Sequence, residues 1–148
     1  MIAPDFKVKR MLETGELAIV PFDPKCLNPA GYDLRSAFPL VIKPGEQKLV
    51  STLERVELPP TAAGLLHLRS SFAREGLFAS LALVDPGFKG QLTIALFNAG
   101  SEPVEISRGE PFVQITFVSL QGRAKRPYAG RYQGSAGVVE SLRRPKTE

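Results

Sequence analysis

The chain has 148 residues, of which 43% are hydrophobic and 23% charged, so it can bury one core but is too short for two independent domains. No apolar run approaches the roughly 18 residues of a membrane-spanning helix, and the N-terminus has no hydrophobic signal core. One cysteine, Cys26, and one histidine, His67, exclude an intrachain disulfide and are too few for a protein zinc site. We therefore expect a cytoplasmic protein with no membrane partner and no zinc-dependent chemistry.

The formal net charge is +4, and the excess lies near the C-terminus. The basic residues there are Arg123, Lys125, Arg126, Arg131, Arg143, Arg144 and Lys146. They form either a solvated tail or a surface for an anionic partner, and charge alone does not choose between a polyphosphate and a nucleic acid. Nucleic acid is the less expected partner, because the sequence has no cluster of aromatic residues for base stacking.

The first predicted element is a short helix. Asp5 is a candidate N-cap, Val8, Met11 and Leu12 share one face, and Gly15 is a typical stop.

Short apolar runs follow the helix and are separated by turn sequences rich in proline and glycine. We expect strands at Leu17 to Val20, Leu40 to Ile42, Lys48 to Leu53, Gly64 to Leu68, Phe78 to Val84, Gln91 to Phe97, Val104 to Ile106 and Phe112 to Leu120. Many short strands at this spacing favour an all-β sandwich or barrel. From residue 125 the sequence becomes polar and basic, so residues 1–124 are expected to form the β core of a single domain and 125–148 an arm.

The segment Asp85 to Phe88 (DPGF) has the sequence of a type II turn, with proline second and glycine third. In the strand that follows, alternation places Leu92, Ile94 and Leu96 on one face and Ala95 on the more polar face. Asp85 is either a turn-forming residue or a functional carboxylate, and the turn pattern alone does not decide.

A second candidate segment is LRSSFAREGL, residues 68–77, which follows a predicted strand. It places hydroxyl and guanidinium groups close together, at Arg69, Ser70, Ser71 and Arg74. These groups suit phosphate oxygens, and a helical turn beginning at Ser70 or Ser71 would direct its backbone N–H groups the same way. The alternative is a capped short helix with surface arginines.

Five segments stand out in order along the chain: AGYDLRSA, RSSFAREGL, VDPGFKGQLTIALFNAG, RGEPFVQITF and RYQGSAGVVES. Taken together, they resemble the homotrimeric dUTPase and dCTP deaminase superfamily. The resemblance implies a distorted β-barrel of jelly-roll character, a homotrimer with active sites at subunit interfaces, and a C-terminal arm that closes over a nucleoside triphosphate.

The resemblance also implies roles for individual residues. Asp85 matches the aspartate that activates the attacking water, and Asp33 matches an aspartate near the region where Mg²⁺ meets the phosphates. The expected substrate contacts are Arg69, Ser70, Ser71 and Arg74 in the phosphate segment, Gln114 in the fourth motif, Phe88 against the deoxyribose, and Lys89, Tyr128, Arg131 and Ser135.

Two departures bear on which reaction to expect. Members of the deaminase branch have a glutamate that transfers protons where this chain has Ala95, and an arginine where it has Leu83. In contrast, ALFNAG resembles the dUTPase pattern. A methyl group cannot move a proton, so the pattern favours a deaminase-like scaffold with dUTPase-like catalytic residues.

The expected function is therefore hydrolysis of dUTP to dUMP and pyrophosphate. Asp85 would act as general base, while Mg²⁺ and the cationic residues stabilise the triphosphate charge. The alternatives are dCTP deamination, alone or coupled to dUTP hydrolysis, and a catalytically silent nucleotide-binding trimer.

Overall fold

A computed structural model describes residues 1–144, so residues 145–148 of the predicted arm lie outside the described residues. Helix α1 runs from Asp5 to Glu13 and buries Val8 and Met11, as the apolar spacing predicts. Gly15 follows the helix with φ +75°, which confirms the predicted stop. The predicted Asp5 cap is wrong: Pro4 is the N-cap, and Asp5, already helical, accepts a hydrogen bond from the neighbouring Phe6 N–H at 2.7 Å.

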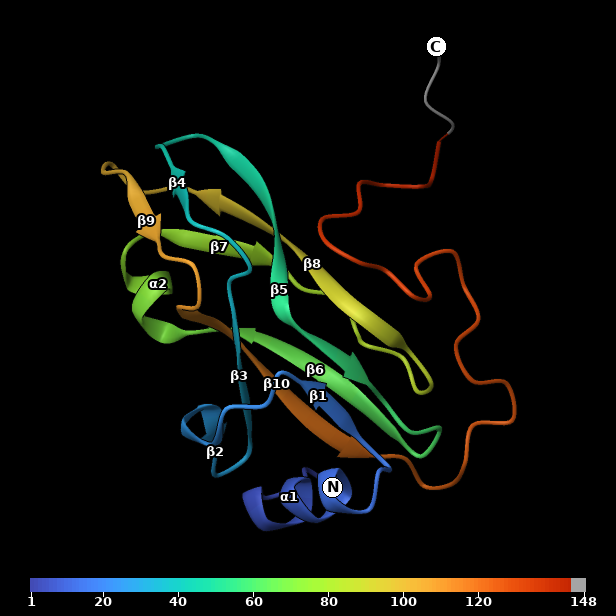
Figure 1. The fold of residues 1–148 in the computed structure, drawn as a ribbon. Helices are drawn as coiled ribbons and strands as arrows, with labels where there is room; N and C mark the ends of the chain where they lie inside the picture. Colours follow the sequence, from blue (N-terminus) through green and yellow to red (C-terminus); the bar gives the residue numbers. More distant parts are fainter. Residues whose placement is uncertain (145–148) are drawn as a thin grey trace.

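The rest of the fold is almost entirely β-structure, as predicted (Figure 1). A short 3₁₀ turn, η1, spans Pro24–Cys26, and a second helix, α2, spans Ser70–Arg74, where the sequence predicts a helical turn. The strands are β1 (Ala18–Val20), β2 (Leu27–Asn28), β3 (Gly31–Arg35), β4 (Leu40–Ile42), β5 (Gln47–Glu57), β6 (Ala62–Leu68), β7 (Leu77–Ser80), β8 (Lys89–Asn98), β9 (Val104–Ile106) and β10 (Pro111–Ser119). None of the helices within residues 1–144 is long and apolar enough to cross a membrane.

Two four-stranded sheets and one two-stranded sheet make up this structure. Their strand orders are β1-β5-β8-β7, β2-β3-β10-β6 and β4-β9. One apolar core includes Val50 and Ile94 from the first sheet together with Leu34 and Phe117 from the second. The all-β prediction is confirmed. The described strands form an open arrangement of several sheets and do not close into a complete barrel.

The predicted strand from Phe78 to Val84 is interrupted in the structure. Strand β7 ends at Ser80, and the chain then leaves β8. Val84 instead pairs with Gly64 of β6 through two backbone hydrogen bonds of 2.9 Å. The apolar run from Phe78 to Val84 is long enough for one strand. Its second half, after Ser80, instead connects the two four-stranded sheets and leads into the Asp85 turn.

A buried ionic cluster joins β3 to β5. The Glu54 side chain is fully buried and accepts hydrogen bonds from Arg35 Nε at 2.6 Å and from the Arg35 backbone N–H at 2.9 Å. The Tyr32 hydroxyl is a further partner at 3.4 Å. Burial opposes the charge of Arg35, but the hydrogen bond and the charge of Glu54 outweigh it and raise the pKa of Arg35.

We predict that Glu54→Gln lowers the free energy of unfolding by about 3 kcal/mol, because it removes the buried counter-charge of Arg35 and leaves only the more exposed Asp23, at 3.5 Å, to pair with it. Urea unfolding at a fixed protein concentration measures this loss. Glu102→Gln, at an exposed loop position, is the matched control and should change stability by less than about 0.5 kcal/mol. Equal midpoints for the two variants would show that the cluster does not stabilise the fold.

Candidate active site

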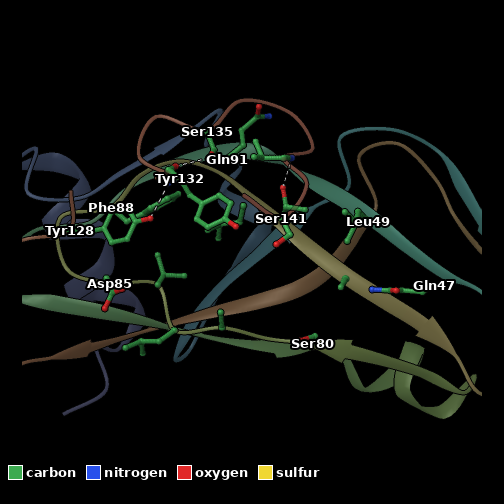
Figure 2. A pocket seen from close by; sticks show the side chains of 17 residues that line it. Gln47, Leu49, Ser80, Asp85, Phe88, Gln91, Tyr128, Tyr132, Ser135 and Ser141 are labelled. Atoms are coloured by element: carbon green, nitrogen blue, oxygen red, sulfur yellow. Dashed lines mark hydrogen bonds between the residues drawn. The ribbon is translucent and has the colours of Figure 1, made fainter. Parts of the chain in front are cut away.

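A pocket of about 490 Å³ lies between β8, the β7–β8 connection and the C-terminal arm (Figure 2). Four of the predicted site residues line it: Asp85, Phe88, Tyr128 and Ser135. Further lining residues come from the neighbouring strand β5 and from β8 itself, among them Gln47, Leu49, Gln91, Thr93 and Ala95. The pocket therefore brings together the turn, the strand and the arm that the sequence analysis singled out.

The turn that carries Asp85 has the predicted geometry. The Phe88 N–H donates to the Asp85 carbonyl at 3.1 Å, and Gly87 has φ +87°, which suits the third position of a type II turn. Leu58 holds the turn from the other side: its carbonyl accepts from Gly87 N–H at 3.2 Å, and its N–H donates to the Phe88 carbonyl at 2.9 Å. Together with the Val84 bridge, these bonds fix the backbone on both sides of Asp85.

The Asp85 side chain itself is exposed, and its carboxylate has no hydrogen-bond or ion-pair partner within residues 1–144. Among the described residues that line the pocket, it is also the only Asp or Glu. Its backbone is therefore fixed while both carboxylate oxygens stay available, which is what a general base requires.

The face of β8 beside the pocket has the predicted alternation. Ile94 and Leu96 are buried in the core, whereas Gln91, Thr93 and Ala95 line the pocket. Leu92, predicted on the buried face, is the exception: it is half-buried and also lines the pocket. Across the sheet, Ala95 pairs with Leu49 of β5 and with Ser80 of β7. The two strand partners of Ala95 thus have an isobutyl and a hydroxymethyl side chain, and neither of them is an acid.

The C-terminal arm covers this site by following β8. Tyr128 N–H donates to the Pro86 carbonyl at 2.8 Å, Gly134 N–H to the Lys89 carbonyl at 2.8 Å, and Gln91 N–H to the Ser135 carbonyl at 2.8 Å. The aromatic rings of Tyr128 and Phe88 meet edge to face with centroids 5.6 Å apart.

Strand β8 has room for this contact because β7 pairs with it only from Ala95 to Asn98. The earlier part of that edge of β8 is therefore left to the arm. A side chain at Gly90 would place its Cβ 2.9 Å from the Ser135 backbone, so the close approach requires glycine.

The predicted phosphate contacts lie elsewhere on the chain. Arg69, Ser70, Ser71, Arg74 and Gln114 do not line the pocket. Asp33 Oδ2 lies 3.4 Å from Arg69 Nε, and Gln114 of β10 is the strand partner of both Asp33 and His67. Within a single chain these residues form a second polar group beside α2.

Two predicted contacts on basic residues also lie outside the pocket lining. Lys89 Nζ is 3.7 Å from Glu57 Oε2, and the Arg131 guanidinium donates to the Leu142 carbonyl at 2.6 Å. No group of three or more His, Cys, Asp or Glu side chains that could hold a metal ion occurs in the part of the chain that is described. Asp33 as a water-mediated Mg²⁺ contact stays a prediction, and its observed partner is a guanidinium group.

Sequence reasoning missed Gln91, Thr93 and Gln133. Gln91 Oε1 accepts from Gly137 N–H at 2.6 Å, and Thr93 Oγ1 accepts from Val139 N–H at 3.0 Å, so both hold the arm. Their position on the polar face of β8 was a usable signal. Gln133 had none, because two of its three backbone partners, at Lys89 and Gly87, are distant in sequence.

Comparison with known proteins places this architecture in a class and then in a family. The fold is similar to that of a dUTPase from EIAV, with a TM-score of 0.62 at 23% identity over 78% of this chain and 98% of that one. It is also similar to a dCTP deaminase from Agrobacterium tumefaciens, with a TM-score of 0.69 at 18% identity over 78% of this chain and 47% of that one. The chain thus has the all-β, dUTPase-like fold that the resemblance implies.

Comparisons of sequence identify the family more narrowly than the fold does. A family model described as dCTP deaminase-like matches residues 36–120. Proteins named dCTP deaminase from Pyrococcus furiosus and Thermococcus kodakarensis are 45% and 46% identical, each over 97% of this chain and 99% of the relative. One from Aeropyrum pernix is 33% identical over 93% of this chain and 94% of the relative. The chain belongs to the dCTP deaminase family.

These relatives correct the predicted function. The sequence-based prediction of dUTP hydrolysis as the main reaction is wrong, because relatives at 45% identity over nearly the full length have the name dCTP deaminase. The error came from treating Ala95 as decisive. A missing acid at one position excludes one proton carrier, but Asp85 is present among the described lining residues and can carry protons instead.

We predict that Gly87→Ala loosens the arm, because a Cβ there would lie 2.6 Å from Pro127 Cβ. Faster tryptic cleavage after Arg131 is the expected readout. Gly109→Ala is the matched control, since Gly109 has a similar φ of +80° with nothing within 4 Å of its Cβ position. Both variants should lose about 1 to 2 kcal/mol of stability from backbone strain. Equal cleavage rates would contradict the proposed Pro127 contact.

Proposed function

We propose that this protein hydrolytically deaminates dCTP to dUTP and ammonia. The observation that supports this most strongly is the 45% identity to dCTP deaminases across 97% of the chain. The pocket supports it as well, because it offers a positioned carboxylate, Asp85, beside an aromatic pair that suits a deoxyribose and base, Phe88 and Tyr128.

In the proposed reaction Asp85 takes a proton from water as the water oxygen forms a bond to C4 of cytosine. Asp85 then gives this proton to the ring nitrogen N3, so the tetrahedral intermediate is neutral. Asp85 next takes the proton of the new C4 hydroxyl and passes it to the amino group, the C4–N bond breaks, ammonia leaves and the C4 carbonyl of uracil forms. With no acid at Ala95, all of these proton transfers fall to Asp85.

The triphosphate requires cations, and the described residues that line the pocket include neither Lys nor Arg. We propose that Arg69, Ser70, Ser71, Arg74 and Gln114 of a neighbouring copy meet the phosphates in a homotrimer. Apolar side chains next to the pocket support a neighbour at this place: Phe78 is 65% exposed, Leu83 54% and Phe97 42%. Exposed apolar side chains of this size, two of them aromatic, are typical of surfaces that another protein covers.

Magnesium enters this scheme as part of the substrate. Mg²⁺ keeps several of its waters and is commonly held through the phosphates of a nucleotide. The Asp33 carboxylate, paired with Arg69, would act on the phosphate region through that guanidinium. The expected substrate is therefore the magnesium complex of dCTP.

The direct test supplies the purified chain with dCTP and Mg²⁺ and measures ammonia and dUTP together. We expect equal amounts of both products. Parallel reactions with dUTP report pyrophosphate. Pyrophosphate release from dUTP without ammonia release from dCTP would overturn the proposal.

Asp85→Asn tests the role of the carboxylate. Removing general-base catalysis should lower kcat by about 10² to 10⁴-fold, while the Kd for dCTP, measured by calorimetry, changes little because the amide has the same shape. Asp5→Asn, on the exposed side of α1, is the control and should keep full activity. If binding is lost in proportion to activity, Asp85 holds substrate and is not the base.

A further inference from the structure

The amide of Gln133 connects the C-terminal arm to the turn that carries Asp85. Gln133 Oε1 accepts from Lys89 N–H at 2.8 Å. Its Nε2 donates to the Gly87 carbonyl at 2.9 Å and to the Tyr128 carbonyl at 3.2 Å. One exposed side chain therefore bonds the backbone on both sides of Phe88 and also the arm itself.

These three bonds need a neutral amide. Only a side chain that offers an acceptor and a donor from one planar group can satisfy an N–H at Lys89 and a carbonyl at Gly87 together. A carboxylate at the same place would still accept from Lys89 N–H, but its second oxygen would face two carbonyl oxygens. Position 133 is therefore chemically specific although it is exposed.

Gln133 also lies where the arm begins to pair with β8. The next residue, Gly134, donates to the Lys89 carbonyl, and Ser135 accepts from Gln91 N–H, both at 2.8 Å. The hydrogen bonds of Gln133 to both Lys89 and Gly87 fix which arm residue pairs with which residue of β8. A shift of the arm along β8 would displace Tyr128, Tyr132 and Ser135, which line the pocket.

We propose that Gln133 is a positioning residue: it sets the register of the arm on β8 and so holds the arm side of the pocket opposite Asp85. The activity measurement that tests this role of Gln133 rests on the proposed deaminase function. Gln133 does not line the pocket, so it acts through the arm and the turn. Its loss should weaken substrate binding more than it slows the chemical step.

The test compares Gln133→Glu with Gln121→Glu in the full chain. Gln121 is exposed in the loop after β10, so the control makes the same change of charge without touching the arm. We expect Gln133→Glu to raise the KM for dCTP by about tenfold, the effect of losing one to two hydrogen bonds, with kcat within about twofold of the unchanged chain. Gln133→Ala should raise KM in the same direction.

A second readout does not depend on turnover. Tryptic cleavage after Arg131 should be faster in Gln133→Glu than in Gln121→Glu, and saturating dCTP with Mg²⁺ should restore protection. Equal KM values and equal cleavage rates in the two variants would overturn the role of Gln133. If the unchanged chain releases no ammonia but the cleavage difference persists, the deaminase proposal fails while the docking role of Gln133 stands.

Discussion

The fixed backbone around Asp85 is the constraint on which the rest of the site depends. Val84 is held by β6, and Leu58 bonds both Gly87 and Phe88, so the turn cannot move independently of either sheet. This support fixes the backbone from which the Asp85 carboxylate projects, so only its side-chain torsions remain to be set when substrate binds. Because no described partner occupies its oxygens, the same group is free to accept a proton and to return it.

The C-terminal arm is bonded both to strand β8 and to the Asp85 turn. Strand β7 stops at Ser80 and leaves part of the edge of β8 unpaired, and an unpaired edge offers N–H and C=O groups to another segment. The arm uses these groups and, through Gln133, bonds the turn as well. Gly90 permits this approach because any Cβ there would meet the Ser135 backbone. Arm, strand and turn therefore form one unit around the pocket.

Local chemistry explains which features the sequence could predict. The DPGF turn and the Gly15 stop follow from residue preferences over a few positions, and the structure confirms both. The alternation in β8 is confirmed for Ile94, Leu96 and Ala95 but not for Leu92. The Glu54 cluster, the Asp33–Arg69 pair and the Gln133 contacts join residues that are far apart in sequence. Local patterns contain no information on such pairs. The prediction of dUTP hydrolysis failed for a different reason: it treated the missing acid at Ala95 as decisive, whereas relatives that are 45% identical over nearly the whole chain have the name dCTP deaminase.

Deamination and phosphate hydrolysis differ in which atom water attacks, so the fate of the water oxygen tests the account most directly. Turnover of dCTP in ¹⁸O-labelled water, followed by mass spectrometry of the separated base and phosphate fragments, locates the new oxygen. If Asp85 activates water toward C4, the label appears in the C4 carbonyl of the uracil product and the phosphates stay unlabelled. Label confined to phosphate oxygens, with the base unlabelled, would contradict the account.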